Sequence, residues 1–173
     1  MDFITVDFDK SIDRSAFDCG KHPALNTYIV EHAGQDQKRN LSRTFLYVED
    51  GLLLGYYTLA NTSLALSELS DEQRKKMPRY PMPAVLLSRL AVDKMVQGQG
   101  LGLRLMGDFF RRVYEISKQS GVAFIVVDAK DSTVADFYRD ALGFLPSSNN
   151  PLRLVLSTAT LIQGFRSLAQ SER

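Results

Sequence analysis

A glycine-rich turn is the feature of this sequence that most narrows the folds open to it. The turn reads Gln97-Gly98-Gln99-Gly100-Leu101-Gly102. Residues 84–92 before it have the apolar character of a buried strand. Residues 100–118 after it carry apolar side chains at helical spacing, namely Leu101, Leu105, Phe109, Val113 and Ile116. A buried strand, a tight turn and a long helix in succession predict a mixed α/β fold.

The same turn has the chemistry of an anion site. The first N–H groups of a helix have no partner inside the helix, and the helix dipole favours negative charge there. Glycine at positions 98, 100 and 102 lets the backbone approach phosphate oxygens closely. Glycine also serves tight connections for purely steric reasons, so context decides between the two roles. The lysine and hydroxyl residue of a nucleotide P-loop are missing, and the spacing differs from that of a dinucleotide fold. The turn therefore predicts a cradle for a pyrophosphate.

The remaining elements fit a β-α-β-α-β order in the second half of the chain. Asp50-Gly51 is a strong tight-turn signal, which predicts a hairpin of residues 43–49 and 52–60. Further strands are expected at residues 3–8, 122–127 and 152–156. Helices are expected from Pro23 to Gly34, after a capping box of Ser70 and Gln73, and from Asp131 to a stop at Gly143.

Composition limits the class of protein. A chain of 173 residues that is 45% hydrophobic suits one domain over residues 1–173. The sequence from Met1 has no long apolar run, so we expect no signal peptide, no membrane span and a cytoplasmic protein. The single cysteine, Cys19, cannot form an internal disulfide and is expected to be structural. A net charge of +1 identifies no partner.

The turn and its strand resemble the GNAT acetyltransferases. Their acetyl-CoA signature is Arg or Gln, two residues, Gly, one residue, then Gly or Ala, after a strand ending like Leu90-Ala91-Val92. This resemblance implies a GNAT fold with a central sheet splayed at the acetyl-CoA site. It further implies that pantetheine lies along Leu90, Ala91 and Val92, and that Gln97, Gly98, Gln99, Gly100, Leu101 and Gly102 hold the pyrophosphate. A tyrosine corresponding to Tyr138 often acts as the general acid in this family.

Four upstream motifs resemble the toxin branch of the GNAT family. They are Phe17-Asp18-Cys19-Gly20, Leu25-Asn26-x-Tyr28, Arg43-Thr44-Phe45 and Gly55-Tyr56-Tyr57. The resemblance implies an enzyme that acetylates the α-amine of aminoacyl-tRNA and so blocks translation. It also implies a ribbon-helix-helix antitoxin as partner and a homodimer. Two alternatives stay open: an acetyltransferase for a small-molecule amine, and a catalytically idle module that binds coenzyme A or an antitoxin.

Individual residues keep two interpretations at this stage. Tyr138 stands four residues after Val134, so it fits a packing aromatic as well as a proton donor. Arg89 lies inside an apolar strand, where its charge needs either a structural ion pair or a substrate. Arg43 belongs to a short basic group that can meet tRNA phosphate or simply face solvent. Asp93, Asp128 and Asp131 are expected in turn and cap roles, and no metal site is expected.

Overall fold

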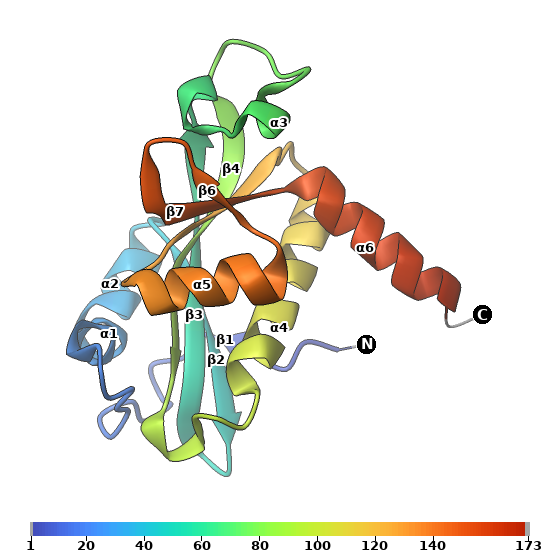
Figure 1. The fold of residues 1–173 in the computed structure, drawn as a ribbon. Helices are drawn as coiled ribbons and strands as arrows, with labels where there is room; N and C mark the ends of the chain where they lie inside the picture. Colours follow the sequence, from blue (N-terminus) through green and yellow to red (C-terminus); the bar gives the residue numbers. More distant parts are fainter. Residues whose placement is uncertain (1, 172–173) are drawn as a thin grey trace. The chain divides into compact units, whose positions relative to one another are not determined.

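The computed structural model describes residues 2–171. The chain forms two compact units. The first unit comprises Met1–Ala60 and Leu87–Arg111, and the second comprises Asn61–Leu86 and Arg112–Arg173. Three elements run from one unit into the other: strand β3 (Leu52–Leu64), strand β4 (Met82–Val92) and helix α4 (Leu101–Ser117). Figure 1 shows these elements along the chain. The predicted α/β fold with flanking helices is confirmed.

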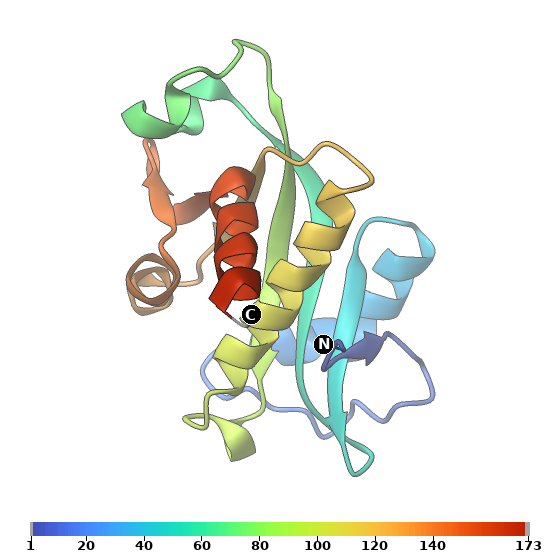
Figure 2. The ribbon, with the colours of Figure 1, turned by 90° about the vertical axis from the view of Figure 1, so that its right-hand side faces the viewer.

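The strands of the first unit follow the order β1-β2-β3-β4. β1 (Val6–Asp7) and β2 (Arg43–Glu49) are antiparallel, as are β2 and β3. Asp50 and Gly51 both have positive φ angles, of 51° and 76°, which suit the tight hairpin turn. The predicted hairpin is therefore confirmed (Figure 2), although β3 continues past residue 60 to Leu64.

β1 is shorter than the predicted strand at residues 3–8. The backbone N–H of Ile4 donates to Oδ1 of Asp108 at 2.7 Å instead of joining the sheet. The Thr5 hydroxyl and the Tyr57 hydroxyl donate to Oδ2 of the same carboxylate, at 2.5 and 2.7 Å. A buried carboxylate on α4 therefore draws the start of the chain away from β2.

The helical segment of the first unit overturns one prediction. It begins at Pro23 as expected, and runs through α1 (Pro23–Thr27), the π-helix η1 (Tyr28–His32) and α2 (Ala33–Lys38). It passes through Gly34 without ending there. Asn40 takes the left-handed conformation at φ 59°, and Leu41 N–H donates to the Asp36 carbonyl at 2.9 Å. The prediction was wrong because asparagine, which tolerates this conformation, ends the helix in place of glycine.

The strands of the second unit follow the order β4-β5-β7-β6. β5 (Phe124–Asp128) is antiparallel to β7 (Asn150–Ser157), and β7 is antiparallel to β6 (Leu145–Ser147). β5 is buried from Phe124 to Val127, as its unbroken apolar sequence predicted. α5 (Ser132–Leu142) lies against β7 in Figure 1. The 3-10 helix η2 (Leu66–Glu68) and the short α-helix α3 (Asp71–Arg74), which was predicted after Ser70, precede β4.

The predicted caps of this unit are confirmed. Ser70 Oγ accepts from Gln73 N–H, and the Gln73 side chain accepts from Ser70 N–H. Asp131 Oδ1 accepts from Val134 N–H at 2.9 Å, and Gly143 ends α5 at φ 74°. The short strand β6 and the C-terminal helix α6 (Thr158–Ser171) were not predicted, and neither was η2.

Candidate functional site

The glycine-rich turn lies in the first unit and has the conformation of an anion cradle. Gly98 and Gly100 have φ angles of 77° and 82°, a left-handed conformation that side chains disfavour. Arg104 N–H donates to the Gly100 carbonyl at 3.2 Å at the start of α4, so the N–H groups just before it have no partner inside the helix. A Cβ built on Gly98, Gly100 or Gly102 meets no atom within 4 Å. The turn therefore presents unobstructed backbone donors at a helix N-terminus.

Two carboxylates, the buried Asp93 and the half-buried Asp18, hold the entry to this turn. The 3-10 helix η3 (Lys94–Val96) follows β4, and Asp93 caps it by accepting from Met95 N–H at 2.9 Å. Asp93 also accepts from Asp18 N–H at 3.1 Å, and Asp18 pairs with Lys94 at 2.8 Å. The Lys94 ammonium, followed by hydrogen bonds from Gly20 N–H and the Asn26 amide, lowers the pKa of the Asp18 carboxyl to about 2. The predicted cap role of Asp93 is confirmed, whereas the ion pair of Asp18, a residue named from the sequence only as part of a motif, was not predicted.

The side chain of Gln97 has a structural task. Its amide nitrogen donates to the Cys19 carbonyl and to the Val92 carbonyl, both at 2.8 Å. These bonds tie the turn to the end of β4 and to the loop that contains Cys19. The Gln97 side chain is therefore engaged within the protein, and a cofactor role for Gln97 stays a prediction.

Cys19 itself is buried, and its thiol donates to the His22 carbonyl at 3.2 Å. Burial raises the pKa of this thiol, so it stays protonated at neutral pH. The structural role expected for Cys19 agrees with this environment.

The end of β4 carries the predicted pantetheine residues. Ala91 is buried, and Leu90 and Val92 are half-buried on either side of it. Asp93 N–H donates to the Leu54 carbonyl at 2.8 Å, so the end of β4 is hydrogen-bonded to β3. The cofactor role of these residues stays a prediction.

The structure shows which group the Arg89 side chain contacts. It is half-buried in β4, and no ion pair joins it to a carboxylate within residues 2–171. Its Cζ atom lies 3.5 Å from the centre of the Tyr28 ring. A cation–π contact therefore takes the place of the structural ion pair.

Arg43, the second arginine predicted to bind substrate, is exposed at the start of β2. Its Nη1 donates to the Gln37 carbonyl at 2.9 Å, and its Nη2 donates to Oδ1 of Asn40 at 2.8 Å. Arg43 therefore stabilises the C-terminal end of α2, where a cation is favoured by the helix dipole. A substrate role for it stays a prediction.

Tyr138 lies in the second unit, on α5, and is 4% exposed. Its ring packs edge-on against Phe137 and Phe144, with centroid distances of 5.3 and 5.6 Å. Burial raises the pKa of its hydroxyl, which therefore stays protonated at neutral pH. The packing role considered from the sequence is present, and the hydroxyl is in the proton-bearing form that an acid requires.

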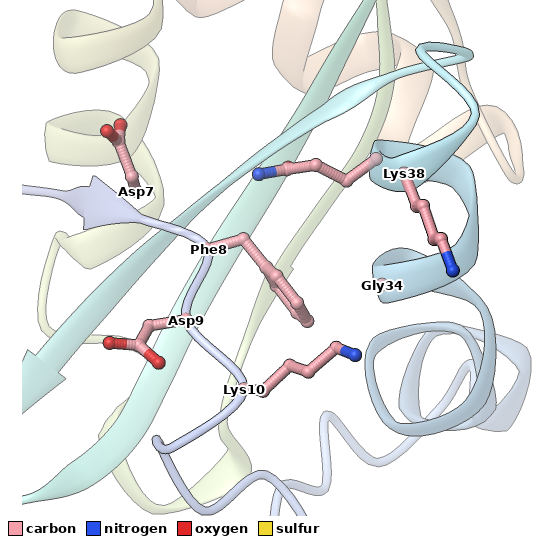
Figure 3. Close-up of a pocket in the computed structure, with 7 residues that line it drawn as sticks. Asp7, Phe8, Asp9, Lys10, Gly34 and Lys38 are labelled. Carbon is pink, nitrogen blue, oxygen red and sulfur yellow. The ribbon is translucent and has the colours of Figure 1, made fainter.

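An open groove of about 550 Å³ lies elsewhere in the first unit, between the end of β1 and α2 (Figure 3). Lys10 and Lys38 line it, but so do Asp7 and Asp9. The charges balance, so the groove identifies no ligand. Among residues 2–171, no group of three or more metal-ligating side chains gathers. Within the same range, no helix combines the length and apolar character needed to cross a membrane.

Comparisons with known proteins place these features in a family. No family model matches the sequence. A curated relative, the "tRNA-acetylating toxin" of Mycobacterium tuberculosis, is 35% identical over 144 residues, which cover 83% of this chain and 85% of the relative. This likeness extends over the turn, the strand before it and most of the remaining chain.

Solved structures share the fold at high similarity. AtaT complexed with acetyl-methionyl-tRNAfMet matches with a TM-score of 0.85 and 29% identity, covering 95% of this chain and 99% of that one. AtaTR bound with acetyl-CoA matches with a TM-score of 0.80 and 30% identity, covering 95% and 98%. A tyrosine-to-phenylalanine mutant of AtaT bound to the C-terminus of the antitoxin AtaR matches with a TM-score of 0.79 and 27% identity, again covering 95% and 98%.

Proposed function

Because this chain belongs to the family of tRNA-acetylating GNAT toxins, we propose that it transfers the acetyl group of acetyl-CoA to the α-amine of an aminoacyl-tRNA and so stops translation. The observation that carries this proposal is the glycine-rich turn, with left-handed Gly98 and Gly100 and open space at each glycine. The presence of both this cradle and Tyr138, whose hydroxyl stays protonated, supports an active enzyme over an idle module.

The proposed cofactor site consists of the turn and the end of β4. The backbone from Gln97 to Gly102 binds the pyrophosphate, and Leu90, Ala91 and Val92 bind the pantetheine arm. The backbone N–H groups near Ala91 stabilise the oxyanion that develops on the thioester. The complex of AtaTR with acetyl-CoA supports this assignment in a protein of the same fold.

The α-amine of the acceptor needs little help from the protein to lose its proton. An α-amine has an ordinary pKa of about 7.7 to 8.0, so an appreciable fraction is neutral at pH 7. Water can accept the proton that the amine loses on attack, and a strong protein base is unnecessary. Tyr138 is proposed to donate a proton to the departing thiolate of coenzyme A. Its buried, protonated hydroxyl supports a donor role.

The proposal extends to substrate contacts and partners. Arg89 and Arg43 are proposed to contact the acceptor. A ribbon-helix-helix antitoxin and a homodimer are proposed from the resemblance of the upstream motifs, and the complex of AtaT with AtaR supports an antitoxin partner. A cytoplasmic location follows from a tRNA substrate. Residues 1–173 are proposed to fold as one domain, since β3, β4 and α4 each contribute to both units.

The test is a transfer assay with radiolabelled acetyl-CoA. Purified protein is given a panel of aminoacyl-tRNAs and, separately, free amino acids and polyamines. We expect acetyl-aminoacyl-tRNA as the product, and growth arrest when the gene is induced without an antitoxin. The matched control is Gly100→Glu, which places bulk and negative charge in the cradle and should be inactive and harmless. Acetylation confined to small amines would replace the proposal with the small-molecule alternative.

A further inference from the structure

The Arg89 guanidinium has donors that the protein leaves free. A guanidinium carries five N–H donors in its plane, and stacking on Tyr28 at 3.5 Å occupies its face and not its edge. No ion pair joins Arg89 to a carboxylate anywhere in residues 2–171. A half-buried cation without a counter-ion is costly to the fold. The edge of Arg89 is therefore suited to an acceptor that comes from outside the chain.

Tyr28 is held as a fixed support for this arginine. It is 4% exposed, and its hydroxyl is within 3.0 Å of both Oδ2 of Asp36 and Oγ of Ser42. Its ring stacks on Tyr56 with a centroid distance of 6.5 Å and an interplanar angle of 21°. Tyr56 is in turn held by its hydroxyl, which donates to the Leu25 carbonyl at 2.6 Å. Several independent contacts therefore fix the plane on which the guanidinium lies.

The two aromatic rings that support Arg89 carry no negative charge. Burial raises the pKa of both Tyr28 and Tyr56, so both rings stay neutral at physiological pH. Tyr28 also opens the π-helix η1, and single π-helical turns occur frequently at functional sites. The rings therefore orient the Arg89 cation without forming an ion pair with it.

Arg89 lies close to the proposed thioester site along β4. Arg89 and Ala91 are two residues apart in β4, so they lie on one face of the strand, separated by about 7 Å along it. Ala91 belongs to the segment proposed to hold the thioester. In an aminoacyl-tRNA, the negative charge nearest to the reacting amine is the phosphodiester of the terminal nucleotide. It lies within one nucleotide of that amine.

We propose that Arg89, supported by Tyr28, binds the phosphodiester of the 3′-terminal nucleotide of the acceptor RNA. An arginine edge matches a phosphate with two parallel hydrogen bonds. This inference rests on the proposed function, because it assumes an aminoacyl-RNA acceptor. Arg89 contacts the substrate directly, and Tyr28 is a positioning residue.

The test compares two minimal acceptors that differ by one phosphodiester. One is aminoacyl-adenosine, and the other is the aminoacyl ester of the dinucleotide cytidylyl-adenosine. Wild-type protein should use the dinucleotide with a kcat/KM about tenfold higher or more. Arg89→Gln should lose most of this preference, mainly through a higher KM for the dinucleotide, so that its kcat/KM values for the two acceptors become nearly equal. Arg89→Lys should keep part of the preference, since the charge remains without the fork.

Variants of Tyr28 separate positioning from folding. Tyr28→Phe retains the ring and should keep most of the phosphodiester preference, whereas Tyr28→Leu should lose it. The matched control is Arg111→Gln, because Arg111 is also half-buried and lies 5.1 Å from the Phe3 ring centre in the same unit. This control should keep the preference.

Three results would overturn the inference. Wild-type protein could show no preference for the dinucleotide, Arg89→Gln could slow both acceptors equally, or Arg111→Gln could remove the preference as fully as Arg89→Gln. Failure of the proposed function gives a different result, since wild-type protein would then acetylate neither the minimal acceptors nor aminoacyl-tRNA.

Discussion

Replacing Gly100 with alanine separates backbone strain from ligand binding in the glycine-rich turn. Gly100 has a φ angle of 82°, and an alanine Cβ there would meet no protein atom within 4 Å. The substitution therefore produces no clash in the free protein. Its cost to folding is the strain of a left-handed alanine, about 1 to 2 kcal/mol. For a chain of this size, each kcal/mol corresponds to a fall in Tm of about 2 to 4 °C.

The effect on acetyl-CoA should exceed this strain. The pyrophosphate is proposed to approach the backbone where the new Cβ would stand. Loss of one hydrogen bond to a charged group costs about 1.5 to 3 kcal/mol, so the Kd should rise by at least about tenfold. Isothermal titration calorimetry measures this constant, and differential scanning calorimetry measures the Tm.

Two further glycine variants separate the effect on Tm from the effect on the Kd for acetyl-CoA. Gly51→Ala imposes the same strain at the hairpin turn, where φ is 76° and the Cβ also meets no atom within 4 Å. It should lower the Tm equally and leave the Kd unchanged. Gly102→Ala has no positive φ to oppose it and should cost no stability. If Gly100→Ala and Gly51→Ala bind acetyl-CoA with the same affinity, the cradle has been placed wrongly.

The remaining predictions concern Tyr138 and Asp18. Tyr138→Phe should reduce turnover by about a hundredfold to ten-thousandfold with little change in Tm or acetyl-CoA affinity, because its ring contacts with Phe137 and Phe144 are kept; near wild-type turnover would leave Tyr138 as a packing residue only. Asp18 has a pKa lowered to about 2, so its stabilising effect is present above its ordinary pKa of about 3.9 and is lost as pH falls toward 2. Thermal melts of wild type and Asp18→Asn should therefore differ at about pH 5 and converge near pH 2, and a Tm gap independent of pH would contradict this account.

Local signals account for the elements that were predicted correctly. The hairpin at Asp50-Gly51, the capping box at Ser70 and the cap at Asp131 each depend on residues a few positions apart. The buried strand β5 was evident from its continuous apolar sequence. The prediction of a helix end at Gly34 was wrong for a related reason. Both Gly34 and Asn40 can adopt the left-handed conformation, and the helix ends at Asn40.

The features of the candidate site also fall into those that the sequence predicted and those that only the tertiary structure showed. The sequence by itself determined the anion-binding turn, because glycine spacing, a preceding strand and a following helix are adjacent in the chain. It also determined the family, through motifs that occupy fixed positions. Only the tertiary structure showed that Gln97 uses its side chain to hold the turn, bonding to Cys19 far away in the sequence.

The partner of Arg89 likewise came from the tertiary structure. The helices α2 and α3 and the complete strands β2 and β3 lie between Tyr28 and Arg89 in the chain, yet the guanidinium lies 3.5 Å from the ring centre. The sequence indicated that a charge in this strand needs a partner, because burying an unpaired charge among apolar side chains is costly. Which partner it meets depends on how distant segments pack, and no local pattern encodes that.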